Sequence, residues 1–242
     1  RAPITICPAA MMSPPRLRET VGLHDASGET QTVLNAAGVS VRAIDDFAEP
    51  LPRLTIIGRE SVGEGVRAAA PALRRHVAEG GTLVVFEQRD LSGLELPVEL
   101  APVGEQRAYI TPHAPGHPLF AGLTGTTIGP WRGYPAGLRS SYSKPANGQF
   151  RVLAGASGER WVGNSTLAIG EVPYGKGRYV LCQVELIGHY GRDPQATLLT
   201  HNLLAWAAAA QPSHEPATCA VVHGEAPPLA EAYVRATGRQ PS

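Results

Sequence analysis

Charged and amide side chains follow the predicted buried strands of this sequence. The runs 54–57 and 82–86 are apolar apart from one threonine each, as expected for strands covered on both faces, and the run 179–184 is also rich in apolar residues. Parallel strands bring their carboxyl ends to one edge of a sheet, where open α/β sheets bind ligands. We therefore expect a shared crevice lined by Arg59, Glu60, Glu87, Gln88, Arg89, Glu185 and His189.

Four carboxylates follow these strands, and two of them could form the carboxylate pair of a glycosidase. They are Glu60, Glu87, Asp90 and Glu185. Charged residues ordinarily occupy loops, however, and sheet-edge carboxylates without aromatic platforms make a poor sugar site. No catalytic residue is therefore predicted.

Aromatic side chains gather instead in a long irregular stretch, residues 91–149. A stretch of this length is unusual for a simple connection and is typical of functional loops. Trp131, Arg132 and Tyr134 lie within it, and Trp, Tyr and Arg are the residue types that dominate interface energetics. We expect this loop to border the crevice or to contact another domain, another subunit or a sugar.

Two histidines have the spacing of zinc ligands on a helix, but their context excludes a helix. His113 and His117 are four residues apart, and prolines at 112, 115 and 118 break any helix that would align them. We expect a turn that anchors the irregular stretch. No metal site is predicted.

The glycine-bearing segment 58–65 precedes a predicted helix, as a phosphate-binding loop would. It lacks both the GxGxxG spacing and the lysine of a P-loop. Ser61 with Glu64 three residues later predicts a helix capping box instead. No cofactor is therefore predicted.

Three widely spaced cysteines, Cys7, Cys182 and Cys219, match neither a disulfide framework nor a metal knuckle. Cys182 lies inside an apolar run, where burial raises the thiol pKa and makes the group inert. Cys7 lies at the carboxyl end of the predicted first strand, and no histidine is near it in sequence. Both are predicted to be packing residues.

The charge balance argues against two classes of partner. The chain has 242 residues with 21 Lys and Arg against 21 Asp and Glu, and no basic stripe. Neither nucleic acid nor a membrane surface is therefore an expected partner. No window holds the roughly 20 apolar residues of a membrane span. A soluble chain is expected, and the sequence slightly favours the cytoplasm without fixing a compartment.

The order of the apolar runs predicts an α/β fold, with a three-layer, mostly parallel flavodoxin-like sheet and an antiparallel hairpin extension. Residues 1–210 are predicted to form this domain, including the irregular stretch, and 211–242 a C-terminal extension or linker. Strands are expected at 4–7, 40–44, 54–57, 82–86, 150–154, 166–172 and 178–184. Helices are expected to end near 37 and to span 62–79 and 196–210.

Three segments in this order carry a resemblance to a known family. They are Gly-Gly-Thr-Leu-Val-Val (80–85), His-Pro-Leu-Phe-Ala-Gly-Leu (117–123), and the segment 168–183 that ends in Tyr-Val-Leu-Cys-Gln. With the closing helix, the pattern resembles the class I glutamine-amidotransferase-like fold. It is more narrowly similar to the non-catalytic versions in bacterial glycoside hydrolases, such as the β-galactosidase trimerisation domain.

The resemblance also indicates that amidotransferase chemistry is lost. Family members place a nucleophilic Cys on a glycine-flanked elbow after the strand that corresponds here to 82–86, and activate it with a His. Here the elbow reads Phe86-Glu87-Gln88-Arg89, and the His-Pro-Glu position is occupied by residues 183–186, Gln-Val-Glu-Leu. Both the thiol and the imidazole are missing.

The resemblance thus implies a non-catalytic domain that supports the assembly or the active site of a carbohydrate-active enzyme, a glycoside hydrolase. Its expected partners are other domains or subunits of that enzyme, including a second copy of the chain, and a carbohydrate. Two alternatives stay open: a small-molecule or sugar-binding module that uses the strand-end crevice, and a hydrolase with a nonstandard site.

Overall fold

One mixed sheet organises the part of the chain that the structure describes. The computed structural model describes residues 12–103, 107–123, 128, 129, 131, 137–157 and 166–209. Within these residues nine strands hydrogen-bond in the order β2-β1-β3-β4-β9-β8-β7-β5, and β6 pairs with β8. The strands are β1 (Val21–His24), β2 (Val41–Ala43), β3 (Leu54–Ile57), β4 (Thr82–Val85), β5 (Tyr109–Pro112), β6 (Tyr142–Ser143), β7 (Arg151–Ser157), β8 (Thr166–Tyr174) and β9 (Gly177–Cys182).

The strands β2, β1, β3, β4 and β9 pair in parallel, and the remaining pairs are antiparallel. If the five parallel strands are numbered by themselves, with β9 as the fifth, their order is 2-1-3-4-5, the flavodoxin-like arrangement. The strand pair β8–β9 closes through a turn at Gly175 and Lys176, with Tyr174 paired to Gly177. The predicted α/β class, with its parallel sheet and antiparallel extension, is confirmed.

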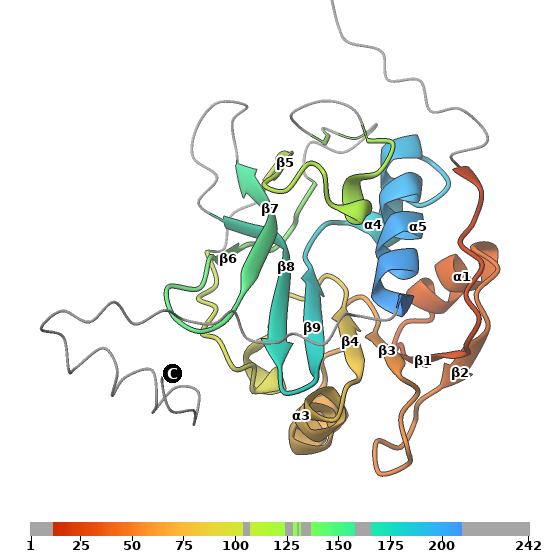
Figure 1. Ribbon diagram of the computed structural model, residues 1–242, viewed down its shortest axis with the longest axis vertical. Helices are drawn as coiled ribbons and strands as arrows, with labels where there is room; N and C mark the ends of the chain where they lie inside the picture. Colours follow the sequence, from red (N-terminus) through yellow and green to blue (C-terminus); the bar gives the residue numbers. More distant parts are fainter. Residues whose placement is uncertain are drawn as a thin grey trace, which may run out of the picture. The chain divides into compact units, whose positions relative to one another are not determined.

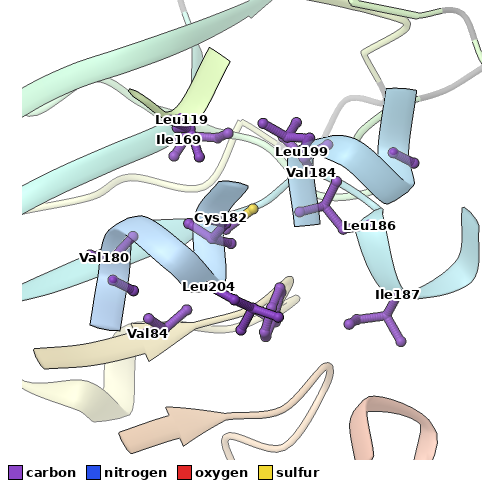
Figure 2. Packing of buried hydrophobic residues seen from close by; sticks show 14 of the residues in the cluster. Val84, Leu119, Ile169, Val180, Cys182, Val184, Leu186, Ile187, Leu199 and Leu204 are labelled. Atoms are coloured by element: carbon purple, nitrogen blue, oxygen red, sulfur yellow. The ribbon is translucent and has the colours of Figure 1, made fainter. Parts of the chain in front are cut away.

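Helices cover both faces of the sheet and make three layers (Figure 1). On one face lie α1 (Glu29–Ala36), α4 (Leu186–His189) and α5 (Pro194–Ala208), and on the other lie α2 (Glu64–Ala68) and α3 (Ala70–Ala78). Successive side chains of a strand point to opposite faces, so Val84 joins the cluster under α5 and Val85 the cluster under α3. Figure 2 shows Val84, Val180 and Leu204 packed together in the first cluster.

The predicted core residues of the central strands are all buried. Ile56, Ile57, Leu83, Val84, Val85 and Val180 are each 0% exposed. The absence of polar alternation in these strands follows from their cover on both faces.

Several predicted boundaries differ from the observed ones. The predicted strand 4–7 lies outside the described residues, whereas β1 was not predicted because it has four residues and contains Gly22. A Cβ at Gly22 would lie 2.7 Å from Ile44 Cδ1 and 2.9 Å from Pro52 Cδ, so a larger residue would require these side chains to move. The predicted helix 62–79 is two helices that meet at Ala69, because Pro71, in the first turn of the second one, has no N–H to continue the hydrogen bonding of the first.

The predicted capping box is wrong. Helix α2 begins at Glu64 after Gly63 and has no side-chain cap. The Ser61 hydroxyl accepts a hydrogen bond from Ala26 N at 3.0 Å and donates to Arg59 O, so it joins two strand-end loops instead.

The irregular stretch 91–149 extends the sheet. It supplies β5, β6 and two short 3-10 turns, η2 (Ser92–Leu94) and η3 (Pro118–Phe120). His117 caps η3 by accepting from Leu119 N, and its ring packs on Trp206 of α5. No helix in the described residues has the length and apolar character to cross a membrane. The division of the chain at residue 210 stays a prediction.

Candidate functional site

Three strand-end side chains form a buried charged cluster. Arg59 follows β3, Glu87 follows β4 and Glu185 follows β9. Arg59 Nε lies 3.2 Å from Glu87 Oε2, and Arg59 Nη2 lies 3.7 Å from Glu185 Oε1. The Glu87 and Glu185 side chains are 2% and 1% exposed, and that of Arg59 is 13% exposed. Parallel strand ends thus bring together charges that are distant in sequence.

Two further residues complete the cluster. Arg59 Nη1 pairs with Glu29 Oε2 of α1 at 2.8 Å. Arg139, from the irregular stretch, pairs with Glu185 Oε1 through Nη2. A backbone hydrogen bond from Glu185 N to Gly137 O, 2.8 Å long, holds the Arg139 segment beside the end of β9.

Burial and a neighbouring carboxylate change the acidity of Glu87. Burial raises its pKa most, the charge of Glu185 raises it further, and Arg59 and Arg139 oppose both, giving a pKa of about 7. At neutral pH a substantial fraction of Glu87 therefore carries a proton. A carboxyl in this state can donate or accept a proton, but the cleft described next is not lined by Glu87.

A cleft of about 830 Å³ opens beside the cluster, between α1 and residues 185–192. Its charged lining comprises Glu29, Arg59, Arg139, Glu185, His189 and Arg192, and its other lining residues are Thr32, Val33, Ala36, Ile187, Gly188, Tyr190 and Gly191. The cleft therefore combines ion pairs with an apolar wall.

His189 is held in a fixed orientation at this cleft. Its Nδ1 lies 2.7 Å from Asp193 Oδ2, and the Trp131 ring packs against it with centroids 4.9 Å apart. Trp131 is 4% exposed and belongs to the main apolar cluster. Trp131 thus packs against a residue of the cleft and is itself buried.

Amide side chains lie in both segments where the resemblance places a thiol and an imidazole, residues 86–89 and 183–186. Gln88 N donates to Gln183 Oε1 at 3.2 Å. The Gln88 amide donates to Gly58 O at 2.6 Å and Phe86 O at 2.8 Å, and accepts from Val62 N at 2.9 Å. Gln88 is a structural link between strand ends, buried to 1% exposure.

The thiol of Cys182, in β9, is also unsuited to nucleophilic chemistry. Cys182 is fully buried, and burial raises its pKa to about 12. It packs among Val84, Val180 and Leu199 (Figure 2), as predicted. Cys7 lies outside the described residues.

The switch point of the sheet, between β1 and β3, is filled by protein groups. Asp25 Oδ2 accepts from Gln31 N at 2.8 Å in the first turn of α1, and Asp25 Oδ1 accepts from the Ser27 hydroxyl. A Cβ at Gly58 would lie 2.7 Å from Asp25 Oδ1. Flavodoxin-like folds bind phosphate at this point. In this chain the Asp25 carboxylate lies there.

The structure brings some of the predicted site residues together and separates others. Arg59, Glu87 and Glu185 form the cluster, and His189 lines the same cleft. Glu60 and Arg89 form a separate pair, 3.4 Å apart, with side chains 36% and 77% exposed. Arg132 and Tyr134 lie outside the described residues. A role in ligand binding or association stays a prediction for all of these residues.

Sequence reasoning missed four charged contributors: Glu29, Arg139, Arg192 and Asp193. The spacing of His189 and Asp193, four residues apart before a helix, was a usable signal. The sequence carries no comparable signal for Arg139, because this residue lies in an irregular stretch that only the tertiary fold places beside β9.

Within the described residues, no cluster of three or more His, Cys, Asp or Glu side chains could hold a metal ion. No protein-family model and no curated protein matches this sequence. Comparison with solved structures does find similar folds.

A ThuA-like protein from Bacteroides uniformis is 12% identical with a TM-score of 0.53, over 86% of this chain and 95% of that one. A GMP synthase subunit from Thermoplasma acidophilum is 9% identical with a TM-score of 0.50, over 80% and 95%. At these identities the likeness establishes the fold alone.

Parts of glycoside hydrolases also match. A β-galactosidase from Bacillus circulans is 14% identical with a TM-score of 0.44, and the match covers 77% of this chain and 30% of that one. A TM-score this low gives no support to a shared function.

Proposed function

We propose that this chain is an amidotransferase-like domain that has lost amidotransferase chemistry and supports a carbohydrate-active enzyme, a glycoside hydrolase, through contacts with another domain or subunit. The observation that carries the loss of chemistry is the presence of two amide residues at the strand ends, Gln88 and Gln183, which are linked by a hydrogen bond from Gln88 N to Gln183 Oε1. An amide cannot be deprotonated to a nucleophile at neutral pH, and it cannot take up a proton as an imidazole does. The strand end is therefore a structural joint.

The carbohydrate-active parent enters the proposal from the resemblance in sequence pattern. The fold that the ThuA-like and GMP synthase proteins share with this chain is compatible with it. The partial match to a β-galactosidase adds no weight. Support by docking accounts for a domain that retains a well-packed sheet while its elbow lacks a reactive group.

Glutamine hydrolysis tests the loss of chemistry. Ammonia release from glutamine, measured by a coupled glutamate dehydrogenase assay, should not exceed the rate without protein. Steady release that disappears in Cys7→Ala would overturn the proposal, because it would place a nucleophile outside the predicted elbow.

Assembly tests the supporting role. Arg132 and Tyr134 are the candidate contact residues that remain after the burial of Trp131. In the complete protein, the double variant Arg132→Ala/Tyr134→Ala should weaken association in native mass spectrometry or lower aryl-glycoside hydrolysis, with an unchanged melting temperature. A double variant equal to the parent in both measurements would remove this surface from the proposal.

A further inference from the structure

One carboxylate that lines the cleft beside the charged cluster has an oxygen without a donor in the described part of the chain. Glu185 lines the cleft and is 1% exposed. Its Oε1 contacts Arg59 and Arg139, but no donor in the described part of the chain reaches its Oε2. Leaving a buried carboxylate oxygen without a donor costs free energy. A ligand that brings a hydrogen-bond donor to Glu185 would remove this cost.

Most of the charged groups around the cleft are already paired with one another. Arg59, Arg139 and Arg192 line it, and they face Glu29 and Glu185 in the lining and Glu87 behind Arg59. Three guanidinium groups thus face two lining carboxylates and Glu87, which is partly protonated at neutral pH because its pKa is about 7. Since Arg59 and Arg139 are already paired with carboxylates, an anionic ligand would have to compete with Glu29 and Glu185 for their N–H groups.

Hydroxyl groups satisfy both kinds of protein group at once. Each hydroxyl donates one hydrogen bond and accepts others, so vicinal hydroxyls can donate to a carboxylate and accept from the guanidinium beside it. Carboxylate–guanidinium pairs such as Glu29–Arg59 and Glu185–Arg139 present this combination along the cleft. A neutral ligand also leaves the charge balance unchanged.

The rest of the lining suits the carbon-bound surface of such a ligand. Val33, Ala36, Ile187 and Tyr190 line the cleft beside the ion pairs. Its volume of about 830 Å³ is within the range of small-molecule sites, roughly 300 to 1,000 Å³. An apolar wall with a few convergent polar groups is the usual composition of these sites.

We propose that this cleft binds a neutral polyhydroxylated molecule, a monosaccharide or polyol, whose hydroxyls donate to Glu185 and accept from Arg59 and Arg139. This site is an addition to the supporting role proposed above and does not rest on it. A domain that fails to associate could still bind the ligand, and the reverse also holds.

A steric variant tests the site without disturbing the ion pairs. Ala36 is exposed on α1 and lines the cleft, whereas the neighbouring Asn35 is exposed on the same helix and does not line it. Ala36→Trp places an indole in the cleft, and Asn35→Trp is the matched control. Both variants should retain the parent melting temperature.

Isothermal titration calorimetry of the full chain supplies the readout, with D-galactose, D-mannose, D-glucose and glycerol as probes and inorganic phosphate and ethylammonium as charged competitors. At least one neutral probe should bind saturably to the parent chain. Its affinity for Ala36→Trp should be about tenfold or more weaker, and its affinity for Asn35→Trp should equal that for the parent. The proposal is refuted by no saturable binding of the four probes, by equal binding to Ala36→Trp, or by preferential binding of phosphate or ethylammonium.

A second variant tests the chemistry. Glu185→Gln keeps the side-chain size and replaces one acceptor oxygen with a donor amide. It should weaken the same probe by about tenfold or more. Because this change also leaves two arginines with fewer partners, a variant that does not fold leaves the decision to Ala36→Trp.

Discussion

The buried carboxyl group of Glu87 predicts how the stability of the protein depends on pH. In the folded chain its pKa is about 7, against the ordinary 4.5, because it is buried beside Glu185. Between these two values the folded state holds a proton that the unfolded state has released. The free energy of unfolding therefore falls as pH rises from about 4.5 to about 7, and this contribution is absent above pH 7.

The size of the effect follows from the two pKa values. At about 1.4 kcal/mol per pH unit, their difference corresponds to about 3 kcal/mol. Glu87→Gln resembles the protonated carboxyl and cannot ionise. The stability of the variant minus that of the parent should therefore rise by about 3 kcal/mol between about pH 4 and about pH 8. Any pH-independent loss of contact with Arg59 cancels from this change.

Urea unfolding at a series of pH values measures the difference, with linear extrapolation to water. Val85→Ala is the matched control, since it removes buried volume from the end of the same strand and has no titratable group; its difference from the parent should stay constant with pH. A constant difference for Glu87→Gln would refute the reasoning. A difference that falls with pH would show that Arg59 outweighs burial and keeps Glu87 ionised.

Three more outcomes follow from packing. Ile56→Ala, at a fully buried position of β3, should lower the free energy of unfolding by roughly 2 to 5 kcal/mol in denaturant titrations. Cys182, with a pKa of about 12, should resist iodoacetamide in the native protein and react in urea, as read by peptide mass spectrometry. Gly177→Ala would place a Cβ 2.1 Å from Gly81 O and should lower the free energy of unfolding by roughly 3 kcal/mol or more. Gly65→Ala, where a Cβ on α2 would meet open space, should raise it by about 0.5 to 1 kcal/mol in the same titrations.

The parallel core was predictable because its strands carry a strong signal. Buried strands such as 54–57 and 82–85 are continuous apolar runs, and their order along the chain indicates an α/β sheet. Short β1 was not predictable in the same way, because Gly22 weakens the apolar run and its fit depends on Ile44. The break in the predicted helix 62–79 could have been foreseen, since Pro71 lies within it.

The site was predictable only as far as strand order determines it. Arg59, Glu87 and Glu185 follow strands that run in the same direction, so their meeting could be inferred. The separation of Glu60 and Arg89 from that cluster could not be inferred, because the direction of a side chain after a strand depends on the local backbone. Glu60, for example, has a left-handed backbone with a φ of 51°. Arg139 reaches Glu185 through an irregular segment without periodicity.

Asp25 has a consequence for attempts to give this scaffold a new ligand. Its carboxylate lies at the β1–β3 switch point and accepts a hydrogen bond from Gln31 N in the first turn of α1. A phosphate group designed to bind there would have to compete with this carboxylate for the Gln31 N–H. Redesign would therefore have to begin with Asp25. Gly58 would have to stay, since a Cβ there would lie 2.7 Å from Asp25 Oδ1 and 2.9 Å from Thr30 Oγ1.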